Sequence, residues 1–200
     1  VEGFYTILDD VFALRDMDDA ADGGKVKERY NGSGATVRGF NVEGRAAFTR
    51  WFELQAGVTL QQSRYKEPEF WSEDAEVPPV RRMFRTPDAY GYFTASFKPV
   101  RNFTADLSGT CTGSMLVQHM AGSGVAQDVA VSTPSFFDMN IRLSYDVRIY
   151  KEITMQLYGG VQNLFNAYQK DFDKGVDRDS GYIYGPSLPR SWFVGAKFSF

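Results

Sequence analysis

The stretch that decides the fold is Phe137 to Val147, FDMNIRLSYDV, in which apolar and polar side chains alternate without a break. One face would carry Phe137, Met139, Ile141, Leu143, Tyr145 and Val147. The other face would carry Asp138, Asn140, Arg142, Ser144 and Asp146. A period of two is the side-chain period of a β-strand. Strands of soluble sheets usually have about five or six residues, whereas a strand that crosses a bilayer needs about nine to eleven. The stretch therefore predicts a membrane strand with one face toward lipid and one toward a wet lumen.

Seven further segments repeat this design: residues 1–14, 36–48, 52–60, 89–97, 103–113, 153–161 and 190–200. The first is ambiguous, because either Phe4 and Leu8 or Tyr5 and Ile7 could point outward. The connections alternate between about twenty residues and about three or four, an asymmetry typical of outer-membrane barrels. We therefore predict an all-β fold, an antiparallel transmembrane β-barrel segment of about eight strands with long extracellular loops and short periplasmic turns.

Composition narrows the class of protein. The chain has 200 residues, a net charge of −3 and one cysteine, Cys111. No apolar run approaches the roughly eighteen residues of a transmembrane helix, so we exclude a helical membrane protein. The small charge gives no case for a nucleic-acid partner. A lone cysteine in phase with apolar neighbours predicts a small surface residue rather than a nucleophile.

A family resemblance is carried by GGVQNLFN at 159–166 and YGPSLPRSWFVGAKFSF at 184–200. The chain resembles the C-terminus of TonB-dependent outer-membrane receptors, and its loops look like those of the Bacteroides-type lineage. In that family the penultimate strand ends in V-x-N-L-F-[ND], and the final strand follows a G-x-P-R-like segment and ends on an aromatic residue. The matching positions are Val161, Asn163, Leu164, Phe165, Asn166, Gly185, Pro189, Arg190 and Phe200. The motif covers about the last forty residues, and the architecture covers the whole chain.

The resemblance implies a barrel of about twenty-two strands, plugged by an N-terminal domain, that takes up a scarce nutrient such as an iron chelate, haem or cobalamin. It also implies four partners: outer-membrane lipid, a small-molecule nutrient, TonB through the N-terminal region alone, and the barrel-assembly machinery, whose signal includes Phe200. Because the chain begins at Val1, we expect residues 1–200 to be the C-terminal part of such a barrel, with the plug domain and earlier strands absent.

Candidate ligand-binding residues lie in the long loops. Exposed aromatic or imidazole side chains there can contact a nutrient, and the candidates are Phe70, Trp71, His119, Tyr182 and Tyr184. His119 stands beside Met115 and Met120, which together could hold haem or copper, although a loop histidine is more often only part of a loop. Ser114 and Ser123 lie near it without a nucleophile elbow or a spaced acid, so we do not expect an enzyme.

The run DFDKGVDRDSG at 171–181 is the one candidate cation site. Asp171, Asp173, Asp177 and Asp179 offer the hard oxygen ligands that calcium prefers. The match to an EF-hand loop is poor, because the glycine comes one position early and the closing glutamate is missing. The alternative is a solvated loop in which Lys174 and Arg178 partly neutralise the acids. We expect no cofactor beyond this possible calcium ion.

Aromatic residues predict two interface girdles. Trp51, Phe97 and Tyr150 stand near short turns, and Tyr65, Trp192 and Tyr184 stand near long loops.

Two other architectures stay open at this point. A self-contained eight-stranded outer-membrane barrel, porin-like or adhesin-like, would need side chains to fill its lumen, and the inward positions Gly160, Gly195 and Ser144 look too small for that. A soluble lipocalin-type barrel would turn its apolar face inward.

Overall fold

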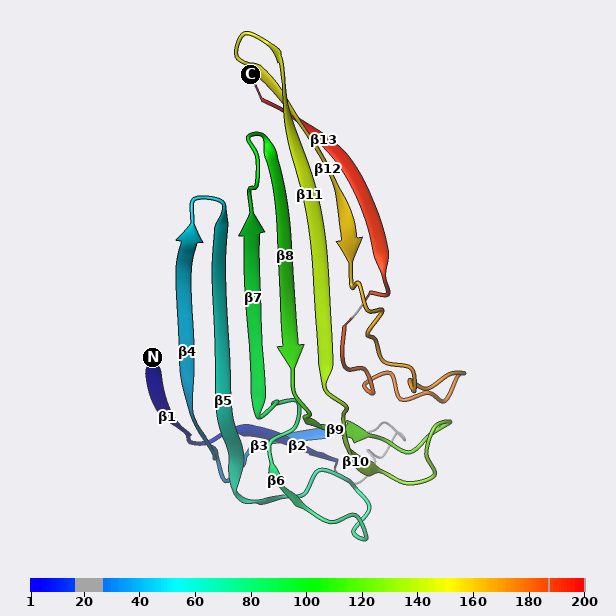
Figure 1. Ribbon diagram of the computed structural model, residues 1–200. Helices are drawn as coiled ribbons and strands as arrows, with labels where there is room; N and C mark the ends of the chain where they lie inside the picture. Colours follow the sequence, from blue (N-terminus) through cyan, green and yellow to red (C-terminus); the bar gives the residue numbers. More distant parts are fainter. Residues whose placement is uncertain (17–26, 187, 200) are drawn as a thin grey trace.

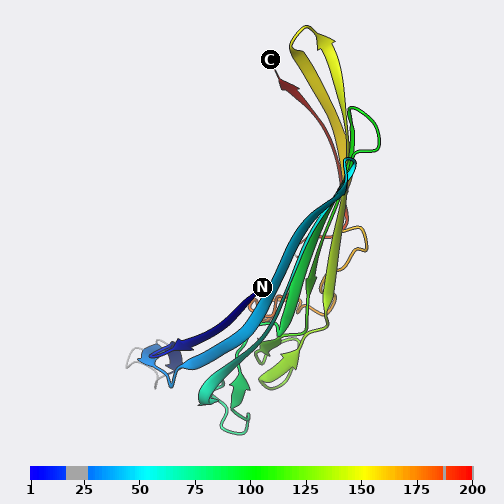
Figure 2. The same cartoon turned by 60° about the vertical axis from the view of Figure 1, so that its left-hand side comes forward.

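The alternating segments form one curved antiparallel sheet in the computed structural model, which describes residues 1–16, 27–186 and 188–199 (Figures 1 and 2). The strands pair in sequence order, β1-β4-β5-β7-β8-β11-β12-β13. Their bounds are β1 (Glu2–Leu8), β4 (Ala35–Thr49), β5 (Phe52–Glu69), β7 (Ala89–Phe97), β8 (Phe103–Thr112), β11 (Phe136–Tyr150), β12 (Ile153–Gln162) and β13 (Ser191–Ser199). These strands correspond to the eight predicted segments, and the prediction of an antiparallel all-β fold is confirmed. The first segment, predicted as residues 1–14, is shorter than expected, because its strand ends at Leu8.

The sheet is open in the part of the chain that the structure describes. Its edges, β1 and β13, do not pair with each other. The three short turns lie at one end of the sheet and the long loops at the other (Figure 1). No helix within these residues is long and apolar enough to cross a membrane.

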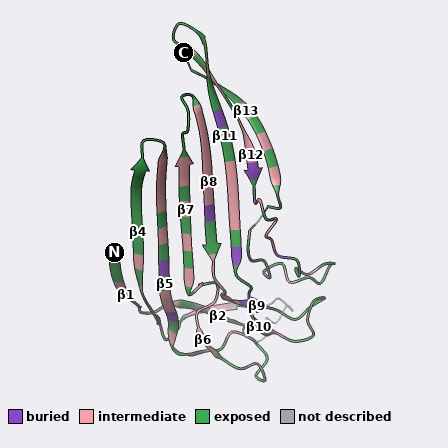
Figure 3. Ribbon diagram, in the orientation of Figure 1, coloured by how far each residue is buried: buried purple, intermediate pink, exposed green. Residues whose placement is uncertain are grey.

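Strand register fixes two chemically different faces. Leu143 pairs with Ala105 and Gly159, whereas Ser144 pairs with Thr104 and Tyr158. On the apolar face, Leu143 is 46% exposed and Val194 is 89% exposed, because no second layer packs against them. Figure 3 shows the strands mostly exposed or intermediate, with few buried positions. A lipocalin-type barrel would bury its apolar side chains in a core, and this sheet does not.

Five glycines of the sheet are each covered by an aromatic ring from the strand beside them. Five such pairs lie directly opposite in the register: Phe4–Gly39, Tyr92–Gly57, Phe93–Gly109, Tyr158–Gly195 and Phe193–Gly160. A Cβ atom on Gly195 would lie 2.5 Å from the Tyr158 ring, so the ring needs the glycine. An aromatic side chain that covers a glycine helps to pin strand register. The rings of Phe193 and Tyr158 thus occupy the space directly above Gly160 and Gly195.

The pairing of β1 with β4 decides which face of β1 is the apolar one. Phe4 lies opposite Gly39 on the polar face, so Tyr5 and Ile7 occupy the apolar face, 63% and 54% exposed.

The long loops contain more regular structure than the sequence predicts. β2 (Phe12–Asp16) and β3 (Lys27–Asn31) form a hairpin within the first of them, and β9 (Leu116–His119) and β10 (Val129–Ser132) form another. β5 continues to Glu69, nine residues past its predicted end, and β6 (Val80–Arg82) pairs with it. The extension of β5, QQSRYKEPE, has no apolar face, so the alternation that marks a membrane strand is lost there while pairing continues.

Candidate ligand-binding surface of the long loops

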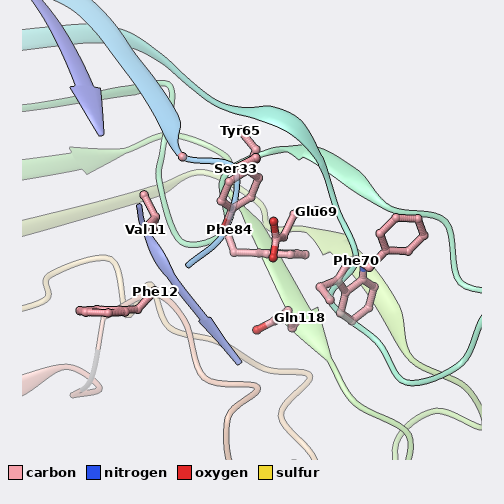
Figure 4. A pocket seen from close by; sticks show the side chains of 11 residues that line it. Val11, Phe12, Ser33, Tyr65, Glu69, Phe70, Phe84 and Gln118 are labelled. Atoms are coloured by element: carbon pink, nitrogen blue, oxygen red, sulfur yellow. The ribbon is translucent and has the colours of Figure 1, made fainter. Parts of the chain in front are cut away.

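An aromatic hollow of about 250 Å³ opens between the β2–β3 hairpin and the end of β5 (Figure 4). Figure 4 shows Val11 and Phe12 on one side of it and Phe70 on the other, with Phe84, Glu69 and Gln118 between them. The full lining is Val11, Phe12, Gly32, Ser33, Gly34, Tyr65, Glu69, Phe70, Trp71, Phe84 and Gln118. The predicted candidates Phe70 and Trp71 are therefore brought together in one site.

The two candidates play different parts in this aromatic hollow. Trp71 packs edge-on against Phe84, with ring centroids 5.3 Å apart, and its indole N–H donates to the carbonyl oxygen of Pro78 at 3.3 Å. Phe70 is 70% exposed, so its ring is available to a ligand. Glu69 accepts a hydrogen bond from the Tyr30 hydroxyl at 3.3 Å. Flat apolar surfaces with a few fixed polar atoms suit a small molecule that carries aromatic rings.

A second hollow, of about 550 Å³, lies within the last long loop. Its one cationic side chain is Arg178, which donates to the carbonyl oxygen of Gly175 at 3.0 Å. The lining is Tyr168, Gln169, Phe172, Asp173, Arg178, Asp179, Ser180, Tyr182, Ile183, Tyr184, Pro186 and Pro189. The predicted candidates Tyr182 and Tyr184 line this second hollow rather than the aromatic one.

A buried polar cluster, which forms part of the lining of the second hollow, ties the loops together. His119 is 6% exposed and stacks on Tyr182, with ring centroids 3.7 Å apart and planes within 4°. Its Nε2 atom lies 3.0 Å from a carboxylate oxygen of Asp173, 54 residues away in sequence. The cluster joins β9 to the last loop, so His119 fastens two loops together and is not exposed to a ligand.

Two tyrosines hold Asp171 in the same cluster. The Tyr182 hydroxyl donates to one carboxylate oxygen at 3.0 Å, and the Tyr184 hydroxyl donates to the other at 2.6 Å. Gln169 braces both tyrosines through their backbone, donating to the Tyr182 carbonyl and accepting from the Tyr184 N–H. Tyr184 is 6% exposed, so its assignment to an interface girdle is wrong.

These contacts shift the ionisation of the cluster. Burial raises the pKa of Tyr184, and its hydrogen bond to Asp171 raises it further. Partial burial by itself would raise the pKa of Asp171, but hydrogen bonds from Tyr184 and Tyr182 outweigh that effect and hold it below the ordinary value. The pKa of Asp173 is lowered chiefly by the backbone N–H of Asp179 and then by His119. The cluster is therefore built around ionised aspartates and neutral tyrosines.

The predicted calcium ligands are used mostly as acceptors within the loops. Asp179 receives the backbone N–H groups of Met120 and Gly181 at 2.8 and 2.7 Å. Asp177 contributes its backbone carbonyl to the N–H of Ser123 at 2.9 Å. Among the described residues, no three acidic, histidine or cysteine side chains are grouped so as to hold a metal ion. The calcium site stays a prediction that these contacts do not support.

Arg85 is a loop contact that the sequence did not reveal. Its guanidinium group donates to the carbonyl oxygens of Ile183, at 2.9 Å, and Gly181. Its backbone N–H donates to Leu116 at 2.7 Å, and its φ angle is +55°. The Arg85 side chain thus joins the segment after β6 to the last loop. The Arg85 backbone joins the same segment to β9. Nothing in the local sequence marks this arginine among its neighbours.

The family-motif asparagines close the last loop onto the sheet. Asn163 is 3% exposed with φ +49°, and its side chain bonds the N–H and carbonyl of Ala167 and the carbonyl of Leu188. Asn166, with φ +54°, accepts the N–H of Arg190 at 2.9 Å. Asparagine tolerates this left-handed conformation better than most residues.

The other motif residues are placed more simply. Leu164 donates its N–H to Met139, and the Phe165 ring stacks on Phe137 with centroids 5.8 Å apart. Pro189 lines the second hollow, Arg190 is exposed, and Phe200 lies outside the described residues.

Comparison with known proteins supports the fold through structure alone. No family model matches the sequence, and no curated protein matches it. Three solved structures match 97% of the chain. They are the ferric-catecholate import receptor Fiu of E. coli K12 (19% identity, TM-score 0.62), a mutant of the ferric enterobactin receptor PfeA of Pseudomonas aeruginosa (14%, 0.61) and the siderophore receptor PiuA of Acinetobacter baumannii (16%, 0.61).

The chain spans about a quarter of the length of these receptors, 24%, 27% and 24% respectively. The resemblance read from the C-terminal motif and the structural match agree: this chain has the fold of a section of the barrel of a TonB-dependent siderophore receptor.

Proposed function

We propose that this chain is part of an outer-membrane receptor for TonB-dependent uptake of an iron–siderophore complex, and that its long loops capture the ligand at the cell surface. The observation that supports this most is the aromatic hollow at the long-loop end of a sheet with the receptor-barrel fold. The fold supports uptake through an outer-membrane receptor. The exposed ring of Phe70 offers a stacking surface for the flat aromatic groups of a catecholate.

The match favours one of the three nutrients named from the sequence. The three solved structures described above are named as receptors for ferric catecholate, ferric enterobactin and a siderophore, and none is named for haem or cobalamin. His119, the one histidine, is buried against Tyr182 and Asp173, so it is not free to bind a haem iron.

The partners follow from the same proposal. The apolar face meets outer-membrane lipid, the C-terminal strand meets the barrel-assembly machinery, and TonB acts through a region outside this chain. The sheet is open at β1 and β13, which suits a section of a larger barrel and not a self-contained barrel of eight strands.

The test is ligand binding to the full-length receptor in detergent, measured by quenching of intrinsic fluorescence with a ferric catecholate. Phe70→Ala should weaken binding by about five- to thirty-fold, the usual loss for an aromatic contact worth roughly 1–2 kcal/mol. A similar loss of affinity in Phe172→Ala, and not in Phe70→Ala, would show that the ligand binds in the second hollow instead. Trp192→Phe, on the apolar face, is the control for a change that leaves the loops intact. Unchanged affinity in both loop variants would contradict the proposed capture surface.

A further inference from the structure

The short-turn end of the sheet is strongly basic although the chain as a whole is acidic. Three turns lie at this end, residues 49–52, 98–102 and 148–152. They carry Arg50, Lys98, Arg101, Arg148 and Lys151 against a single acid, Glu152. The net charge of the whole chain is −3, so this excess of positive charge is local to one end.

Three of these cations line one hollow of about 530 Å³ between the first two turns. Backbone hydrogen bonds hold its walls: the N–H of Lys98 donates to Trp51 at 2.7 Å, and that of Asp146 donates to Asn102 at 2.8 Å. The lining is Arg50, Trp51, Lys98, Pro99, Val100, Arg101, Asn102, Phe103, Thr104 and Asp146. The cations are therefore gathered by the pairing of β5 with β7 and of β8 with β11.

The cations of this hollow are available to a ligand. Arg50 and Arg101 are exposed, and neither forms a side-chain hydrogen bond or ion pair within the described part of the chain. The acid in the lining, Asp146, already accepts a hydrogen bond from Gln156 at 2.8 Å. Lys98 lies within electrostatic reach of Glu53, but that carboxylate is bonded to Arg45.

The third turn differs and provides a contrast. Arg148 donates to the carbonyl of Lys151 at 2.7 Å, and the Lys151 ammonium sits over the Tyr150 ring at 5.2 Å. Its two cations are thus engaged within their own turn.

Exposed apolar side chains stand beside the free cations. Trp51 packs edge-on against Phe97 with centroids 5.3 Å apart and is still 43% exposed, and Val100 is 62% exposed. Tryptophan at the edge of an apolar strand band marks the level of the lipid headgroups. Lysine and arginine at that level attract anionic lipid.

We propose that this hollow binds the phosphate of an anionic glycerophospholipid in the leaflet at the short-turn end, with Arg50, Lys98 and Arg101 as the cationic ligands and Trp51 against the upper acyl chain. The inference rests on the membrane location given above. It does not depend on the transported ligand, because the hollow lies at the opposite end of the strands from the long loops (Figure 1).

The experiment is native mass spectrometry of the full-length receptor, released from micelles that contain equimolar phosphatidylglycerol and phosphatidylcholine with matched acyl chains. The unmodified protein should retain phosphatidylglycerol in roughly ten-fold preference, since each basic residue near an anionic lipid surface adds to the attraction. The triple variant Arg50→Gln, Lys98→Gln, Arg101→Gln should lose that preference. The matched control Arg148→Gln, Lys151→Gln should keep it.

Four outcomes overturn the inference. One is an unchanged preference in the triple variant, a second is an equal loss in the control, and a third is full displacement of the lipid by inorganic phosphate, which would indicate a site for a soluble anion. The fourth is a folded unmodified protein that retains neither lipid. Ferric catecholate binding, measured on the same triple variant, should be unchanged, so failure of this site is distinguishable from failure of the proposed function.

Discussion

Asn163 gives the sharpest test of how the last loop is held. It lies at the end of β12 with its side chain buried, and that side chain bonds the N–H of Ala167 at 2.8 Å, its carbonyl at 3.0 Å and the carbonyl of Leu188 at 2.8 Å. Asn163→Ala removes all three bonds and leaves the backbone partners without them. At about 1 kcal/mol for each bond the loss is roughly 3 kcal/mol. Alanine at φ +49° adds about 1 kcal/mol or more, because its Cβ disfavours the left-handed region.

The matched variant Asn163→Gly separates these two costs, since glycine accepts positive φ without strain. The assay is hydrogen exchange of residues 164–190 in the detergent-solubilised protein. A local loss of roughly 3 kcal/mol should raise exchange there by about 100-fold in both variants, with a further several-fold increase in Asn163→Ala. Exchange in β7 and β8 should stay the same. Unchanged exchange in the last loop would refute the assignment of Asn163 as its anchor, and an equal effect in both variants would refute the backbone argument.

Three further predictions concern the sheet and the loop cluster. Gly195→Ala should lower the thermal midpoint of the barrel because its Cβ would meet the Tyr158 ring at 2.5 Å, whereas Gly44→Ala, with open space around it, should leave the midpoint unchanged. Because the folded-state pKa values of Asp171 and Asp173 are lowered, their stabilisation is present above the ordinary carboxyl pKa and is lost as the pH falls through the lowered values. A nitroxide label at Val176 should therefore gain mobility as the pH is brought from 6 to 3, and constant mobility would contradict the role of the aspartates. Arg85→Lys keeps the charge but cannot span two carbonyls, so tryptic cleavage after Lys174 should become several-fold faster; equal cleavage rates would show that the second bond is unimportant.

The membrane strands could be predicted from the sequence because lipid and lumen impose opposite chemistry on alternate positions. The predicted segments 89–97 and 153–161 agree with the observed strands to within one residue. The end of β5 could not be predicted in this way, because QQSRYKEPE has no apolar face once the strand has left the bilayer. The hairpin of β9 and β10 was missed for another reason: strands of four residues, LVQH and VAVS, are too short to display a clear alternation.

The candidate site was only partly predictable. Phe70 and Trp71 were chosen because two large aromatic residues in a loop are conspicuous, but Val11, Phe12 and Gln118 join them only when separate loops meet. His119 was predicted as a ligand contact, yet it is buried against Asp173 and Tyr182, more than fifty residues away, and no local pattern reveals that packing. The motif asparagines were seen as a family signature, and the structure gives their physical reason in two left-handed turns.

The central claim is that one face of this sheet meets lipid and the other meets water. The most direct measurement is the accessibility of nitroxide labels at Leu143 and Ser144, in the reconstituted receptor with Cys111 replaced by alanine, to lipid-soluble oxygen and to a water-soluble nickel chelate. The account predicts that oxygen reaches the label at position 143 and that the nickel chelate reaches the label at position 144. A label at position 143 that is shielded from both reagents would mean that the apolar face is an internal core, and it would contradict the account.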